Sequence, residues 1–153
     1  MTGAPGGSSR RGLTLAAGAG EGRSPMQSLA RSTFVHIAFA FVAMGGWTLW
    51  ANSGHGLAAA WRPALVQGVI SGVITLVLKR ALEAMVARIR GPAALVLPPL
   101  VTASVILAVL VTIHRLIGTP EIARTIAVPW SVSTLYAIVY GAAVARGRSR
   151  AEA

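Results

Sequence analysis

Long apolar runs alternate with short polar or basic segments along this chain. Three of these runs cover residues 33–51, 93–113 and 129–145. Each is close to the ~20 residues that an α-helix needs to cross ~30 Å of hydrocarbon. The pattern predicts membrane-spanning helices at about 33–51, 93–114 and 129–146.

A fourth apolar run, residues 63–78, is shorter than a full crossing. Pro63 suits the first turn of a helix, where the missing N–H has no partner in any case. The helix can continue to residue 89, because long basic side chains at its end reach out to lipid headgroups. With a helix at 63–89, the sequence predicts an all-α integral membrane protein with four transmembrane helices in an up-down-up-down bundle.

Prolines indicate where one helix is disturbed and where another begins. Pro98 and Pro99 remove amide donors near the start of the third run, so we expect a kinked or loosened helix there. Thr119, Pro120 and Glu121 form a typical helix start, with a capping hydroxyl, a proline and an acid near the positive end of the helix dipole. They predict a short interfacial helix at 120–127.

The two ends of the chain are polar and basic. Residues 1–32 consist mainly of Gly, Ala, Ser, Pro and Arg, which cannot bury enough apolar area to offset the entropy of ordering them. We expect a disordered cytoplasmic tail there and a basic cytoplasmic tail at 147–153. Met26 is an alternative start, since the residues after it read as a short lead into the first helix.

Composition agrees with a membrane location. Apolar residues make up 54% of the chain and charged residues only 12%, whereas soluble domains have about 25% charged residues. The basic residues lie at the ends of the apolar runs, which indicates a bilayer with anionic headgroups as the partner and not nucleic acid. The absence of cysteine excludes disulfides and thiolate chemistry.

Orientation follows from the distribution of Lys and Arg, because basic loops stay on the cytoplasmic side. Of the 14 basic residues, 11 lie before the first apolar run, between the second and third runs or after the fourth, and three lie in the other two intervals between runs. All four tryptophans (Trp47, Trp50, Trp61 and Trp130) fall at the opposite ends of the runs, as in an interfacial aromatic belt. Both termini are therefore expected in the cytoplasm. The Ala, Gly and Arg content suggests a bacterial protein of the inner membrane.

The second helix carries a polar stripe. Gln67, Ser71, Thr75, Lys79 and Glu83 recur at intervals of four and share one face. In lipid such a face must meet protein or water. Its first three residues are either hydrogen-bonding contacts between helices or the lining of a path for a polar solute or ion.

The fourth helix carries a small-residue face. Ser133, Ala137, Gly141 and Ala145 recur at intervals of four, a spacing that lets two helix backbones approach closely. Another helix of the same bundle, or a second subunit, would pack on this face.

Three further polar residues lie within the predicted spans. Tyr136 and Tyr140 share a neighbouring face of the fourth helix, and their hydroxyls need partners if they lie at depth. His36 lies near the cytoplasmic end of the first helix, and an ionisable group inside a membrane is a functional candidate by default.

No catalytic, metal or cofactor motif stands out. His55, His114 and Glu121 all belong near the outer face, but nothing in the sequence fixes their spacing, so neither a metal site nor a headgroup-acting enzyme is expected from them. The chain also lacks a nucleophile elbow and a phosphate loop. We expect a non-enzymatic protein with an interaction or accessory-subunit role, as a homo-oligomer or with a partner membrane protein. The alternative is a small oligomeric transporter or channel lined by the polar stripe.

Overall fold

The computed structural model describes residues 25–151, and their regular structure is helical. The elements in chain order are α1 (Pro25–Ala51), the 3-10 helix η1 (Ser53–His55), α2 (Leu57–Arg88), α3 (Ala93–Leu116) and α4 (Ile122–Ala151). The all-α class with four long helices is confirmed.

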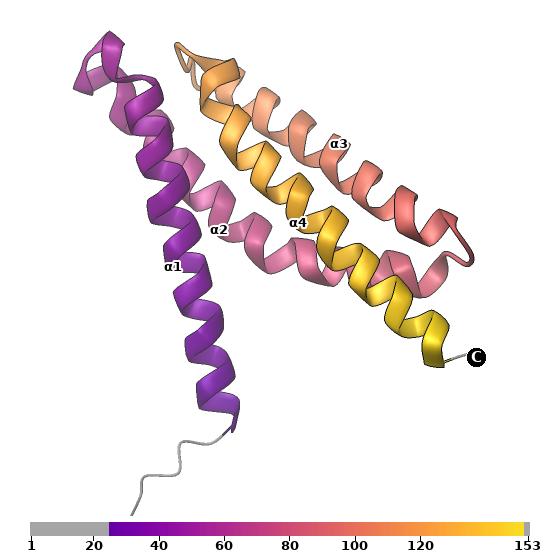
Figure 1. The fold of residues 1–153 in the computed structure, drawn as a ribbon. Coiled ribbons are helices and arrows are strands. Elements are labelled where there is room, and N and C mark those ends of the chain that lie inside the picture. The colour runs from indigo at the N-terminus through magenta and orange to yellow at the C-terminus, as the bar shows by residue number, and fades with distance from the viewer. Residues whose placement is uncertain (1–24, 152–153) are drawn as a thin grey trace, which may run out of the picture.

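The two hairpins α1–α2 and α3–α4 meet at their loops (Figure 1). We call this the loop end, formed by residues 52–56 and 117–121. At the opposite end of α2 the turn into α3 lies beside the last turns of α4, where Arg148 reaches carbonyl oxygens of α2. We call this the basic end, formed by residues 86–95 and 145–150.

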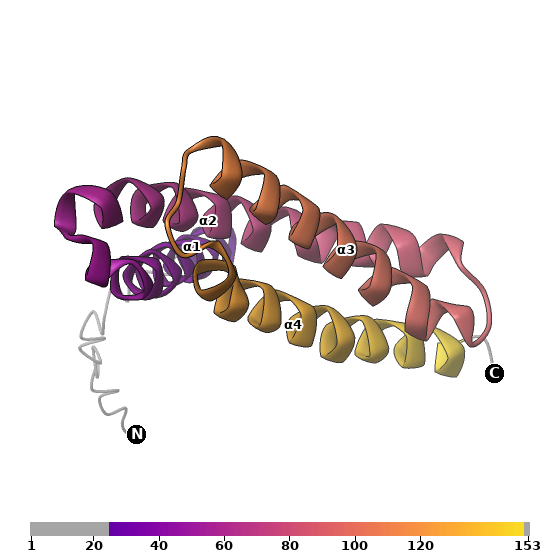
Figure 2. The same cartoon turned by 90° about the horizontal axis from the view of Figure 1, so that it is seen from above.

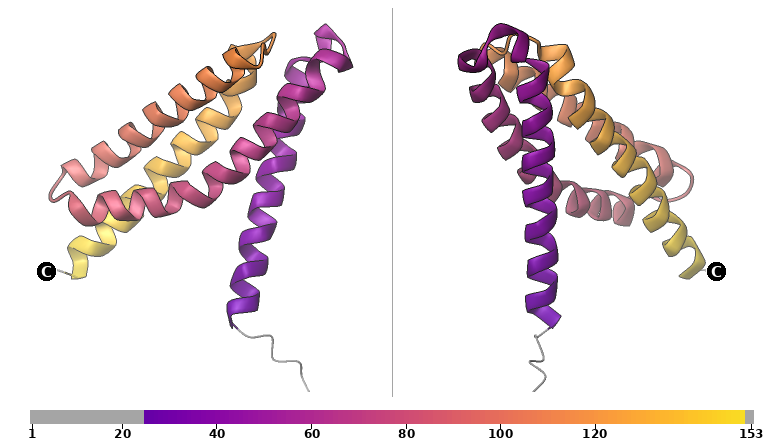
Figure 3. Two further views of the ribbon diagram at one scale, coloured as in Figure 1. Left: turned by 180° about the vertical axis from the view of Figure 1, so that it is seen from behind. Right: turned by 60° about the vertical axis from the view of Figure 1, so that its left-hand side comes forward.

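Helix α2 is the central element of the fold. It packs against α1, α3 and α4, whereas α1 contacts α2 and α4 but has no contact with α3 within the described residues. Figure 2 shows α2, α3 and α4 running side by side with α1 set at an angle to them. Away from the loop end, α1 diverges from α3 and α4 (Figure 3).

Each of the three connections contains a glycine with positive φ. Gly56, Gly91 and Gly118 have φ values of 85°, 68° and 68°. Residues with a Cβ adopt this region at a cost, so these glycines allow the chain to reverse direction within a few residues.

Glycines also set the spacing between α1 and α2. A Cβ built on Gly45 would lie 3.0 Å from the backbone oxygen of Ala64, and one on Gly68 would lie 2.9 Å from the ring of Phe41. The two helices therefore touch almost backbone to backbone, as small residues permit in membrane proteins.

The apolar core lies between α2, α3 and α4. Leu82 of α2, Leu110 of α3 and Ala137 of α4 are fully buried members of this cluster. A smaller cluster of Val86, Ala94 and Ala145 continues the core into the basic end. The small residues of α4 thus let that helix lie close to α2 and α3.

The helices are longer than the apolar runs. α1 already begins at Pro25, so residues 25–32 of the expected tail are helical, and residues 1–24 and 152–153 lie outside the described residues. α2 begins at Leu57 and includes Pro63 inside the helix, not in its first turn. Hydropathy missed these turns because helix ends carry polar and charged residues.

The separate interfacial helix expected at 120–127 is wrong. α4 begins at Ile122 and continues without a break to Ala151, so it also includes most of the expected C-terminal tail. Trp130 consequently lies more than two turns inside α4, where its indole nitrogen donates to the carbonyl oxygen of Ala103. It is a contact between α3 and α4.

The expected disturbance at Pro98 and Pro99 is small. α3 is one continuous helix, and both prolines lie in its first two turns, where few intrahelical bonds depend on them. The visible bend is in α2 (Figure 1). Ser71 and Gly72 lie at the middle of α2, and Thr75 Oγ1 donates to the Ser71 carbonyl oxygen at 2.8 Å, a combination that bends helices.

Three helices are long and apolar enough to cross a membrane by length and composition. They are Phe34–Ala51 of α1, Ala93–Leu116 of α3 and Ile122–Arg148 of α4. α2 is not among the three, and it contains the polar stripe.

The α1–α2 contact predicts a sharp difference between two adjacent glycines. Gly45→Ala places a methyl group against the Ala64 carbonyl oxygen and should destabilise the protein by about 1–3 kcal/mol, the usual range for overpacking. Gly46→Ala has no atom within 4 Å of the new methyl group and should be neutral or slightly stabilising. Unfolding in mixed micelles measures both, and equal midpoints would contradict the close approach.

Candidate functional site

A chain of hydrogen bonds joins α2 to the α3–α4 hairpin near the loop end. His114 Nε2 lies 2.8 Å from Gln67 Oε1, and His114 Nδ1 lies 2.8 Å from Thr119 Oγ1. Gln67 Nε2 donates to Ser71 Oγ at 2.9 Å. Gln67 and His114 are fully buried, so both pay the cost of leaving water and recover it through these bonds.

The hydrogen bonds of this series all run in the same direction from donor to acceptor. The amide oxygen of Gln67 only accepts, so His114 carries its hydrogen on Nε2. His114 Nδ1 then accepts from the hydroxyl of Thr119. The order Thr119, His114, Gln67, Ser71 satisfies both ring nitrogens with neutral partners.

Asn52 forms a second group of buried hydrogen bonds at the loop end. Its side-chain nitrogen donates to Thr125 Oγ1 at 2.8 Å and to the Thr48 carbonyl oxygen at 2.9 Å. Its side-chain oxygen accepts from the backbone N–H of Glu121 at 3.0 Å. Asn52 is fully buried and therefore connects the end of α1 to the start of α4.

Aromatic and charged side chains complete this connection near the surface. Trp47 Nε1 donates to the Arg124 carbonyl oxygen at 2.9 Å. The guanidinium of Arg124 lies 5.3 Å from the ring centre of Trp50, within the range of a cation–π contact. His55 Nε2 lies 3.0 Å from Glu121 Oε1, and both of these side chains are exposed.

The polar stripe is divided by the structure. Gln67 and Ser71 are buried between helices, whereas Thr75 and Lys79 are exposed and Glu83 is half-buried. Because one group is buried and the other is largely exposed, the five side chains do not line one continuous surface.

The part of the stripe nearer the basic end lies beside the tyrosines of α4. Tyr140 donates its hydroxyl hydrogen to Glu83 Oε1 at 2.6 Å, and Lys79 Nζ lies 4.0 Å from the same oxygen. Tyr136 stacks on Tyr140 with ring centres 5.3 Å apart. Tyr136 itself is exposed, as is His36 on α1, so neither joins the buried network.

The small-residue face of α4 is buried inside this chain. A Cβ on Gly141 would meet Pro99 of α3 and Leu82 of α2 at 3.6 and 3.9 Å. Its other members, Ser133, Ala137 and Ala145, are buried as well. The face is thus occupied by α2 and α3 and is not open to a second subunit.

The three residues considered for an outer-face metal or catalytic site do not converge. His55 pairs with Glu121, but both nitrogens of His114 are engaged by Gln67 and Thr119. Within residues 25–151, no group of three or more His, Asp or Glu side chains is placed to hold a metal ion.

Sequence reasoning missed Asn52 and Thr125, and it did not pair His114 with Gln67. Asn52 directly follows the apolar run 33–51 and precedes Ser53 and Gly54, so hydropathy gives it no place in a helix. A buried Asn at the end of an apolar run was a usable signal, since lipid penalises an amide that has no partner. The pairing of His114 with Gln67, 47 residues away, has no local signal.

Comparison with protein-family models, curated proteins and solved structures finds no match to this chain. The geometry of the site is therefore the basis for any statement about function.

The Asn52 contacts give a testable stability difference. Asn52→Ala leaves the Glu121 N–H and the Thr48 carbonyl without this side chain as partner, and should cost about 1–3 kcal/mol. Ser53→Ala removes only an exposed hydroxyl bonded to the Trp50 carbonyl and serves as the adjacent control. Detergent unfolding midpoints compare the two, and a similar loss in both variants would show that Asn52 is not a structural centre.

Proposed function

We propose that this chain is a non-enzymatic, multi-pass protein of the bacterial inner membrane, with four crossings and both termini in the cytoplasm. Three of its helices have the length and composition of membrane spans. The further statements rest on geometry and charge.

The fourth crossing is inferred from where α2 begins and ends. α2 starts at the loop end, beside the end of α3, and finishes at the basic end, where α3 begins. If α3 crosses the bilayer, α2 must cross it in the opposite direction. Its 32 residues extend for about 48 Å, more than the ~30 Å hydrocarbon layer. Burial of Gln67 and Ser71 keeps its polar groups away from lipid.

The orientation is inferred from charge. Eleven of the 14 basic residues lie before residue 33, at 79–90 in the last part of α2 and the turn into α3, or at 146–150 in the last part of α4. The positive-inside rule assigns that side to the cytoplasm. The loop end, with Trp47, Trp50 and Trp61, then lies at the outer surface.

An interaction or accessory role is supported most directly by the hydrogen-bonded state of the buried polar residues. Gln67, His114 and Asn52 are fully buried and bonded within the chain, which is the arrangement of structural contacts. The part of α1 that diverges from α3 and α4 carries exposed apolar side chains, among them Phe39 and Val42. Lipid or a helix of another membrane protein, including a second copy, suits such a surface.

Cysteine labelling tests the topology, because the natural chain has no cysteine. In intact cells a membrane-impermeant maleimide should label Ser53→Cys, at the loop end, and should label Ala93→Cys only after the membrane is opened. Val105→Cys, exposed in the middle of α3, should stay unlabelled in both conditions. Labelling of Ser53→Cys and Ala93→Cys from the same side would refute a crossing by α2.

The rival function is a small transporter or channel. The observation in its favour is the cluster of Thr75, Lys79, Glu83 and Tyr140, which extends the stripe toward the basic end with exposed or half-buried polar groups. A path would have to continue past the buried Gln67 to the loop end.

Solute flux in liposomes separates the two functions. If Gln67 is a structural contact, vesicles with wild-type protein should leak small ions and polar solutes no faster than protein-free vesicles, and Gln67→Leu should leave the rate unchanged. A wild-type flux well above the protein-free rate that Gln67→Leu abolishes would support transport and overturn the accessory role. Size-exclusion profiles verify that both proteins are folded.

A further inference from the structure

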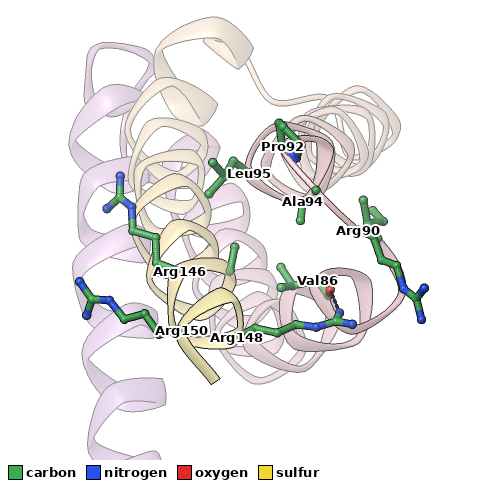
Figure 4. Close-up of a pocket in the computed structure, with 11 residues that line it drawn as sticks. Val86, Arg90, Pro92, Ala94, Leu95, Arg146, Arg148 and Arg150 are labelled. Atoms are coloured by element: carbon green, nitrogen blue, oxygen red, sulfur yellow. Dashed lines mark hydrogen bonds between the residues drawn. The ribbon is translucent and has the colours of Figure 1, made fainter. Parts of the chain in front are cut away.

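A hollow opens at the basic end between the end of α2, the start of α3 and the end of α4. Its volume is about 580 Å³, within the usual range for pockets that hold a small ligand. Figure 4 shows Val86, Ala94 and Leu95 around it, with Arg148 reaching from α4 toward α2.

The inner surface of the hollow is apolar. Val86, Ala94 and Ala145 form a buried cluster there, and Ile89 packs against them. Leu95 also lines the hollow and is partly exposed. An aliphatic chain is the kind of group that such a surface binds.

Arginines surround this apolar surface. Arg90, Arg146, Arg148 and Arg150 all line the hollow, and none of the described residues that line it is acidic. Arg148 donates to the carbonyl oxygens of Val86 and Ala87 at 2.8 Å and so caps the end of α2. Figure 4 shows Arg90, Arg146 and Arg150 directed outward, with long flexible stems.

Apolar walls with arginines at the rim match an amphiphile with a negative head. We propose that the hollow is a binding site for an anionic phospholipid of the cytoplasmic leaflet, with part of an acyl chain against Ile89, Pro92 and Leu95 and the phosphodiester held by arginines at the rim. Basic pockets between transmembrane helices on the cytoplasmic side bind acidic headgroups by this chemistry. The proposal rests on the membrane location and orientation proposed above.

A lipid accounts for the hollow better than a soluble phosphate does. A free phosphate would use the arginines but leave Leu95, which is 40% exposed, in contact with water. A neutral lipid would cover the walls but would not compensate the charge of the arginines. The anionic lipid is the occupant that satisfies both surfaces.

Native mass spectrometry of the full chain in neutral detergent tests the site. The protein is titrated with phosphatidylglycerol and, separately, with phosphatidylcholine of the same acyl chains. Wild-type protein should bind phosphatidylglycerol the more tightly. Arg90→Gln with Arg146→Gln should weaken that binding about 30-fold, the effect of two basic residues near an acidic headgroup. The pair avoids Arg148, whose loss would also uncap α2.

Matched variants identify the cause of any loss. Arg62→Gln with Arg115→Gln removes the same charge from exposed positions nearer the loop end and should change phosphatidylglycerol binding less than about twofold. Leu95→Trp fills the hollow without changing charge and should also weaken binding. Unfolding midpoints verify that each variant is folded.

Three results would overturn the proposal. They are equal binding of the two lipids, equal losses in the two arginine pairs, and displacement of phosphatidylglycerol by an equal concentration of glycerol phosphate, which would assign the site to a soluble phosphate ester. Because binding is measured in detergent, it does not depend on topology. A failure of the cysteine labelling would therefore refute the proposed orientation without changing this result.

Discussion

The fold depends on satisfying polar groups that are buried where little or no water is available. Gln67 and His114 are fully buried, and each is bonded to a side chain of the other hairpin. A hydrogen bond of this kind contributes little net stability in a membrane protein, but its absence leaves an amide or an imidazole unpartnered at depth. The constraint therefore acts mainly on specificity, since a shifted position of α3 along α2 would separate the pair.

The position of this constraint explains the shape of the molecule. Bonds from Asn52 and Trp47 join α1 to the start of α4 near the loop end, whereas α2 is also bonded to α4 farther along, at Glu83 and at its last turn. Farther from the loop end, α1 is held to α2 by close contacts at Gly68 and Gly72, and its described residues have no contact with α3. The divergence of α1 from α3 and α4 is the consequence of contacts that are concentrated at one end.

Hydropathy predicted the four helices because lipid-facing and core-facing positions are both apolar, but it misplaced their ends. The first turns of α2 and α4 contain Arg62 and Arg124, so apolar counting started at Pro63 and Pro129. The stripe on α2 was recognisable from its spacing of four, since Gln67 and Ser71 are neighbours on one helix. Their partner His114 was not recognisable from the sequence. Which residue of another helix lies opposite Gln67 depends on packing between segments that are distant in sequence.

The two ends of the molecule use polar residues in opposite ways. At the loop end, Asn52 and His114 have their side-chain hydrogen-bonding atoms matched within the chain, which leaves them little capacity for a ligand. At the basic end, Arg90, Arg146 and Arg150 point outward around an apolar hollow. An arginine keeps its charge at any physiological pH, so these three can bind anions from outside the fold. The chemistry that this chain offers to other molecules is therefore concentrated at the basic end, while the loop end holds the fold together.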